Sequence, residues 1–142
     1  MFTGLVEATV PLVSYTPVGT GARRDATNTS AAVSVSGGAL TVETYKATDR
    51  LRDPALRDQI RRAAVSVPSN IAEGDERDTD RDSVRFFYIA KGSLAELRTQ
   101  LEIAHEVGLL PAERVHSIQQ QAIVVGRRLG ALIKARSATY ER

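Results

Sequence analysis

The stretch that decides the fold is Leu56–Ile71, LRDQIRRAAVSVPSNI. Its apolar residues recur every three or four positions: Leu56, Ile60, Ala64, Val67 and Ile71. This spacing places them on one face of an α-helix that begins after the Asp53-Pro54 break. Pro68 lies inside this helix and has no N–H to donate, so we expect a bend there.

Two later stretches have the same helical period. The first predicts a long helix that begins near Thr79 or Asp80 and ends before Gly108, with the stripe Phe86, Ala90, Ser93, Leu97, Leu101 and Ala104. The second begins at Pro111 and ends near Arg136, with the stripe Val115, Ile118, Ala122, Val125, Leu129 and Leu132. Short connections force neighbouring helices to run antiparallel. The sequence therefore predicts an all-α, antiparallel up-and-down four-helix bundle.

The first helix of this bundle has a competing interpretation. Between Ala32 and Glu43 the apolar residues alternate around Gly37-Gly38, which is typical of a β-hairpin with a two-residue turn. The bundle instead needs a helix through Leu40–Arg52, and we expect that helix to begin near Thr41. We accordingly divide the chain into an atypical N-terminal extension, residues 1–38, irregular or hairpin-like, and a four-helix-bundle domain, residues 39–142.

The composition excludes several classes of protein. None of the 142 residues is cysteine, which removes disulfides, thiolate nucleophiles and cysteine-based metal sites. No apolar run approaches the roughly 20 residues that span a bilayer, and the N-terminus lacks the basic start of a secretory signal. We expect a cytoplasmic protein. The formal net charge of +2 is modest, so nucleic-acid binding must be argued from where the charges lie.

No motif points to catalysis or to metal binding. Asp78, Asp80 and Asp82 have the opening spacing of a calcium loop, but the glycine and the bidentate glutamate of such a loop are missing. His105 and His116 lie on different predicted helices without a nearby carboxylate or histidine partner. We therefore expect no enzymatic activity, no cofactor, no metal and no small-molecule substrate.

Some polar residues lie at or near the apolar faces of the second and third helices: Asn70, Glu73, Ser93 and Glu96. Buried polar groups must find hydrogen-bond partners, so we expect these four to form a structural network. Gly92 lies inside the third helix, where glycine costs about 1 kcal/mol relative to alanine. We expect a close helix crossing to explain it.

The basic residues form two groups that could bind phosphates. The candidates are Arg57, Arg61 and Arg62 on the second helix, and Arg127, Arg128, Lys134 and Arg136 on the fourth. Cations near the end of a helix also complement its dipole, which accounts for the last two without a ligand. Repeated around an oligomer, the fourth-helix group would form a positive surface able to hold phosphate backbones. Base specificity is not expected, because no aromatic platform accompanies it.

Two segments carry a family resemblance: Gln59–Gly74, QIRRAAVSVPSNIAEG, and Ile89–Ala104, IAKGSLAELRTQLEIA. With Gly108-Leu109-Leu110 they resemble the S23 family, four-helix-bundle proteins named for the 23S ribosomal RNA intervening sequences that encode them. The resemblance implies a four-helix protomer, commonly assembled into a homopentamer, without enzymatic activity. It also implies kinship with a basic, nucleic-acid-binding partner of the reverse transcriptase in diversity-generating retroelements.

A second resemblance is confined to the N-terminus, where Met1–Ala8, MFTGLVEA, is similar to the start of riboflavin synthase. One strand of a barrel cannot fold or bind a lumazine alone, so we interpret it as a fused remnant or a coincidental start.

Together these features lead to one functional hypothesis and one alternative. The hypothesis is a non-enzymatic, oligomeric helical-bundle protein that binds RNA, DNA or a nucleoprotein partner through basic helix surfaces. The alternative is a scaffold for protein–protein interaction that binds no nucleic acid.

Overall fold

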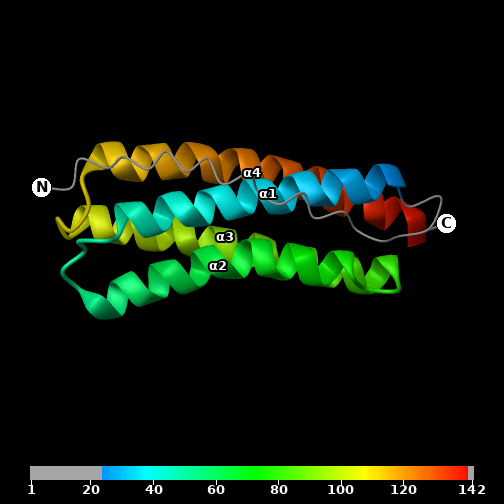
Figure 1. The fold of residues 1–142 in the computed structure, drawn as a ribbon, viewed down its shortest axis with the longest axis horizontal. Helices are drawn as coiled ribbons and strands as arrows, with labels where there is room; N and C mark the ends of the chain where they lie inside the picture. Colours follow the sequence, from blue (N-terminus) through cyan, green and yellow to red (C-terminus); the bar gives the residue numbers. More distant parts are fainter. Residues whose placement is uncertain (1–23, 141–142) are drawn as a thin grey trace, which may run out of the picture.

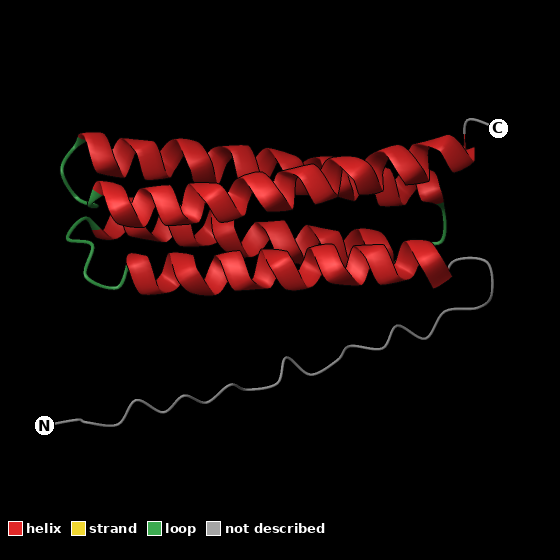
Figure 2. Ribbon diagram, turned by 90° about the horizontal axis from the view of Figure 1, so that it is seen from above, coloured by secondary structure: helices red, strands yellow, loops and turns green. Residues whose placement is uncertain are grey.

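The computed structural model describes residues 24–140, which form four consecutive helices (Figure 1). They are α1 (Arg24–Ala47), α2 (Pro54–Asp75), α3 (Asp80–Glu106) and α4 (Ala112–Tyr140). The helices run side by side with their connections at the two ends of the bundle (Figure 2). α1 and α3 each pack against both α2 and α4, so α1 lies diagonally opposite α3 and α2 diagonally opposite α4. The prediction of an all-α, antiparallel four-helix bundle is confirmed.

The predicted start of the first helix is wrong. α1 begins at Arg24 rather than near Thr41, and the proposed hairpin segment between Ala32 and Glu43 lies inside this helix. Residues 24–38, which we assigned to an extension, therefore belong to the bundle. Only residues 1–23 precede α1, and the resemblance of Met1–Ala8 to riboflavin synthase lies outside the described residues.

α1 packs into the bundle through a face of small and polar residues. Its buried positions recur every three or four residues, at Ser30, Val33, Gly37, Leu40 and Thr44, and Thr48 continues the series just after the helix. Two of the buried hydroxyls donate to the helix's own backbone, Thr44 to the carbonyl of Leu40 and Thr48 to that of Thr44, both at 2.8 Å. Because half of this face is not apolar, the helical period is masked in the sequence and the weaker Gly-Gly turn signal stands out.

The contact between α1 and α2 is built around Pro68. Pro68 has no N–H, so the carbonyl of Ala64 loses its partner within α2. Thr41 of α1 lies 2.8 Å from that carbonyl oxygen and donates its hydroxyl to it. A Cβ on Gly37, one turn earlier in α1, would lie 3.3 Å from the Cβ of Pro68. The bend expected at Pro68 stays a prediction.

The ends of α2 and α3 follow the predicted signals. Asp53 caps α2 by accepting a hydrogen bond from the Leu56 N–H at 3.0 Å, and Thr79 caps α3 through the Asp82 N–H. α3 ends in a Schellman motif, in which Gly108 has a φ of 78° and the Leu109 N–H donates to the Ala104 carbonyl at 2.8 Å.

α4 begins one residue later than predicted and continues past Arg136 to Tyr140. All six predicted core residues of its stripe are buried. On α3, Phe87 is fully buried, whereas the predicted Phe86 is only partly buried beneath the guanidinium of Arg77, 4.4 Å from its ring centre.

The explanation given for Gly92 is wrong. Gly92 is exposed, and an added Cβ would meet no described atom within 4 Å, so no close helix crossing occurs there. Close approaches occur instead at Gly37, at Gly126 against Leu94, and at Gly74, where a Cβ would lie 2.7 Å from the ring of Phe87. Because Gly74 has no side chain, α2 can pack closely against the buried ring of Phe87 on α3.

Between residues 24 and 140, no helix combines the length and apolar character needed to cross a membrane.

Candidate nucleic-acid interface

The predicted basic residues do not form one surface. Arg57, Arg61 and Arg62 lie in the first half of α2, whereas Arg127, Arg128 and Lys134 lie in the second half of α4. These two helices are diagonally opposite and run in the same direction. The two groups therefore occupy different faces and opposite halves of the bundle.

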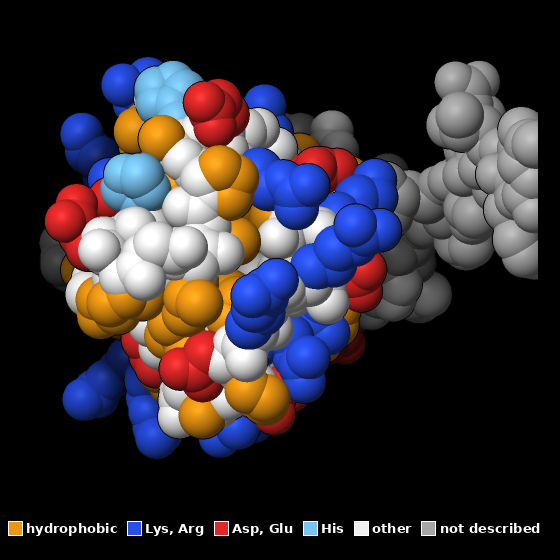
Figure 3. All heavy atoms as spheres, turned by 90° about the vertical axis from the view of Figure 1, so that its left-hand side faces the viewer, with side chains coloured by type: hydrophobic (Ala, Val, Ile, Leu, Met, Phe, Trp, Pro, Cys, Tyr) orange, Lys and Arg blue, Asp and Glu red, His pale blue; other side chains and the backbone are white. Residues whose placement is uncertain are grey.

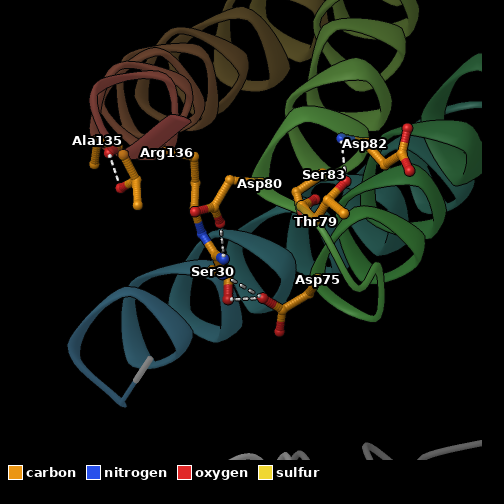
Figure 4. Close-up of polar contacts among 9 residues, drawn as sticks. Ser30, Asp75, Thr79, Asp80, Asp82, Ser83, Ala135 and Arg136 are labelled. Carbon is orange, nitrogen blue, oxygen red and sulfur yellow. Dashed lines mark hydrogen bonds and ion pairs between the residues drawn. The ribbon is translucent and has the colours of Figure 1, made fainter. Parts of the chain in front are cut away.

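Arg136 is a buried structural residue rather than a surface candidate. It is only 5% exposed, and its two terminal nitrogens donate to Asp75 at 3.2 Å and to Asp80 at 2.9 Å. The hydroxyl of Ser30 donates to the same Asp75 oxygen at 2.6 Å (Figure 4). One residue from each helix thus meets here. The proposed phosphate contact at Arg136 is wrong, because its charge is already neutralised and covered.

The structure brings further cations to the α2 group. We use "basic end" for the surface formed by Lys46, Arg50, Arg52, Arg57, Arg61, Arg62 and Arg114. Arg114 of α4 reaches α1 by donating to the Ala47 carbonyl at 3.3 Å. Figure 3 looks onto the end of the bundle that carries the α1–α2 and α3–α4 connections, and Lys and Arg side chains gather on one side of it.

Several carboxylates at the basic end are already engaged. Glu43 pairs with Lys46 at 3.2 Å, Asp53 caps α2, and Asp58 lies 3.5 Å from the Nε of Arg57. At the basic end, Arg50, Arg52 and Arg62 are exposed and make no hydrogen bond or ion pair with the described residues. These three remain available to an external anion.

The opposite end of the bundle has the reverse character. The α2–α3 connection and the helix ends beside it, residues 75–82, contain five acidic residues and two arginines. The acidic residues include Asp75 and Asp80, whose negative charge binds Arg136. Carboxylates therefore gather around the α2–α3 connection, at the end of the bundle away from the basic end.

An aromatic ring lies within the basic end. The guanidinium of Arg61 stacks over Tyr45 of α1, 4.5 Å from the ring centre. Its Nε donates to the Thr48 hydroxyl at 3.0 Å and its Nη2 to the Tyr45 carbonyl at 3.2 Å. An open groove of about 580 Å³ runs beside this pair, lined by Tyr45, Asp58, Arg61, Arg62, Val65 and Ser66.

The basic group on α4 is smaller and has no such ring. Arg128 donates a hydrogen bond to the Ser36 hydroxyl of α1. This contact keeps its guanidinium close to the bundle surface. Arg127 and Lys134 are exposed and make no hydrogen bond or ion pair with the described residues. This surface offers isolated point charges.

The structure brings together two of the four residues of the predicted polar network. The Ser93 and Ser66 hydroxyls lie 2.7 Å apart, and the amide of Asn70 donates to the Ser66 hydroxyl at 2.9 Å. Glu73 pairs instead with Arg77, and Glu96 accepts from Gln100 at 3.1 Å, both on the exposed surface. Ser66 links the network between α2 and α3, and the two glutamates lie outside it.

The histidines and aspartates do not assemble into a metal site in the described part of the chain, where no three His, Asp or Glu side chains are placed to hold an ion. Nδ1 of His105 lies 3.1 Å from the Leu110 carbonyl, and His116 is exposed. Both line a separate groove between α3 and α4, beside Gln119. Gln119 is nearly buried and bridges these helices by donating to Glu102 at 2.8 Å.

Sequence reasoning missed four members of the basic end, Lys46, Arg50, Arg52 and Arg114, and the ring of Tyr45 that lies within it. The residues that precede α2 are interrupted by Asp49 and followed by Asp53, which hides their basic pattern. Arg114 is distant in sequence and joins only through the packing of α4 on α1. Two arginines flanking Leu51 beside the Asp53 cap are the one local signal that could have identified this end.

Comparisons with known proteins agree with the fold. The family model described as 23S rRNA-intervening sequence protein matches residues 31–131. A crystal structure of a protein of unknown function from the S23 ribosomal protein family of Bacteroides thetaiotaomicron VPI-5482 is similar, with a TM-score of 0.60 and 20% identity. That similarity covers 77% of this chain and 98% of the other. No curated protein matches the chain.

Proposed function

The chain belongs to the 23S rRNA-intervening sequence protein family, and from this premise we propose that it is a non-enzymatic protein that binds the phosphate backbone of RNA or DNA. The observation that carries the proposal is the basic end, where Arg50 and Arg52 of the α1–α2 connection and Arg62 of α2 have no partner among the described residues. A cytoplasmic location is part of the same proposal.

The physical basis is the replacement of condensed counterions by protein cations. A protein that neutralises several phosphates releases the same number of bound cations, so its affinity falls steeply with salt. Arginines suit this role because the guanidinium keeps its charge and presents several donors to phosphate oxygens. The acidic connection at the other end supports binding in one orientation, with the basic end toward the polyanion.

The experiment compares two variants that change the charge equally. Arg50→Glu/Arg52→Glu alters the basic end, and Arg127→Glu/Arg128→Glu alters the α4 surface. Binding of a labelled oligonucleotide is followed by fluorescence anisotropy from about 50 to about 200 mM salt. We expect the first variant to lose at least about tenfold in affinity and to reduce the salt dependence, and the second to lose little.

Three results would count against the proposal. Absence of binding by the wild-type protein at low salt would exclude nucleic-acid binding. Affinity that does not respond to salt would exclude a phosphate contact. Equal losses in the two variants would show that total charge, rather than the basic end, determines binding.

A second candidate function is protein–protein interaction, including assembly into a homo-oligomer. It is favoured by the outer face of α1, where residues 26–42 contain no charged residue and Val35 and Val42 are 48% and 53% exposed. Large exposed apolar side chains that cluster on one face often mark an interface. The mass from light scattering tests this directly. We expect an oligomer, and Val35→Lys/Val42→Glu should reduce its mass without changing the net charge.

A further inference from the structure

We infer that the groove between α1 and α2 at the basic end binds an unpaired nucleobase, so that the protein prefers single-stranded to double-stranded nucleic acid. The inference rests on the proposed function and adds to it the class of nucleic acid. It starts from the stack of Arg61 on Tyr45 and from the groove beside that stack.

The stack is held in place before any ligand arrives. Arg61 is fixed through the Thr48 hydroxyl and the Tyr45 carbonyl, so its guanidinium plane stays over the ring. Tyr45 is nevertheless 42% exposed. A flat base can therefore extend an existing stack without having to order these side chains, which lowers the entropic cost of binding.

The charges around the groove are arranged for a nucleotide. Arg62 is exposed and unpaired among the described residues, and Arg61 has one terminal nitrogen, Nη1, without a hydrogen bond to them. Both can face a phosphate. Asp58 on the groove wall would repel a phosphate but can accept hydrogen bonds from the amino group of a base. The phosphate is thus favoured on the arginine side and the base within the groove.

A duplex cannot use this arrangement. Its bases are stacked on one another and their pairing edges are occupied, so a base would first have to be unpaired and unstacked, which costs a few kcal/mol. A single strand presents its bases freely, and stacking on an aromatic side chain tolerates any sequence. The groove has a volume of about 580 Å³ and is open to solvent.

The test uses three labelled probes of one length, about 12 nucleotides. They are a single strand, an abasic strand with the same backbone, and the duplex. The abasic strand retains the charge and removes the bases, so the affinity ratio between the first two probes isolates stacking. Each probe is titrated with the full chain and with Tyr45→Leu, Tyr45→Phe and Tyr88→Leu.

Tyr88 provides the matched control. It is a surface tyrosine on α3, 54% exposed, with the Lys91 ammonium 6.0 Å from its ring centre, but it lines no groove of the basic end. Tyr45→Phe keeps the ring and should keep the stacking. Circular dichroism and thermal unfolding establish that each variant is folded.

We expect the wild-type protein to bind the single strand roughly tenfold more tightly than the abasic strand. Tyr45→Leu should bring this ratio close to one, whereas Tyr45→Phe and Tyr88→Leu should preserve it. The inference is overturned if the wild-type protein binds the single strand and the abasic strand equally well. It is also overturned if Tyr45→Leu leaves the affinity ratio unchanged, or if Tyr88→Leu lowers that ratio as much as Tyr45→Leu does.

These results also separate the inference from the proposed function. If the wild-type protein binds all three probes equally and Arg50→Glu/Arg52→Glu binds none of them, the phosphate contact stands and the base site does not exist. If no probe binds at low salt, both are refuted.

Discussion

The hydroxyl of Thr41 lies 2.8 Å from the carbonyl oxygen of Ala64, the acceptor that Pro68 leaves without an N–H inside α2. A side chain of one helix thus replaces a backbone donor missing from its neighbour. The same hydroxyl lies 2.9 Å from the carbonyl of Gly37, so its single proton is shared between a local and an interhelical acceptor. Proline is tolerated inside α2 because α1 supplies the hydrogen bond.

Thr41→Val should destabilise the bundle by about 1–2 kcal/mol. Valine has nearly the same shape but no donor, so the Ala64 carbonyl would be left unsatisfied at the helix contact. The free energy of unfolding from urea titration measures the effect. Thr99→Val is the matched control, because the Thr99 hydroxyl donates only to the Ala95 carbonyl of its own helix and is exposed.

A double-mutant cycle tests the assignment to Pro68. Pro68→Ala restores an N–H to the Ala64 carbonyl, so Thr41→Val should cost less in that background than in the wild type. Strictly additive effects of the two substitutions would show that Thr41 does not serve the carbonyl freed by Pro68.

The adjacent glycines of α1 should respond to alanine in opposite ways. A Cβ at Gly38 meets no described atom within 4 Å, so Gly38→Ala should stabilise the protein by up to about 1 kcal/mol through helix propensity. A Cβ at Gly37 would lie 3.3 Å from the Pro68 Cβ, both atoms being held close to rigid backbone. Gly37→Ala should therefore be destabilising. Thermal unfolding of the two variants side by side gives the signs, and equal stabilisation would contradict the packing of Gly37 on Pro68.

Arg136→Ala should cost about 3–5 kcal/mol in unfolding free energy. It removes the cation and leaves two carboxylates, Asp75 and Asp80, largely buried without an opposite charge. The triple variant Arg136→Met/Asp75→Asn/Asp80→Asn should lose less unfolding free energy than Arg136→Ala, because it leaves no buried charge without an opposite charge. Urea titration of both variants checks the order of their stabilities. If Arg136→Ala is as stable as the wild type, the ion pairs of Arg136 contribute nothing to stability.

The sequence predicted the parts of the fold that depend on local signals. The apolar stripes of α2 and α4, the break at Asp53-Pro54, the helix start near Thr79 and the stop at Gly108 all act within a few residues, and each is observed. α1 was placed too late because it is held by Ser30, Gly37 and Thr44, whose burial depends on partners in other helices. Its helical character is a property of the packed bundle.

The candidate site was harder to predict than the fold for a similar reason. A basic residue's role depends on what lies opposite it, and Arg136 meets Asp75 and Asp80 only after the four helices assemble. Likewise, Tyr45 and Arg61 are separated by the α1–α2 connection and become neighbours through antiparallel packing. Charge density along the chain cannot distinguish a buried ion pair from an exposed cation.

Gly74→Ala and Gly92→Ala form the last contrast. A Cβ at Gly74 would lie 2.7 Å from the Phe87 ring and 3.0 Å from the Ser83 carbonyl oxygen, so the ring has to shift within a filled core. We expect a loss of roughly 1–3 kcal/mol from overpacking. Gly92 is exposed with open space around it, and alanine there should stabilise α3 by about 1 kcal/mol.

Combining Gly74→Ala with Phe87→Leu tests the cause of the loss. Leucine is smaller than phenylalanine and gives the new methyl group room. The double variant should therefore lose less unfolding free energy than the sum of the losses in the two single variants. For Gly92→Ala, unfolding is measured together with the mass from light scattering. Stabilisation at unchanged mass is the expected result. A destabilised protein of lower mass would instead mean that a second copy packs closely on this face of α3, where only glycine leaves room for it.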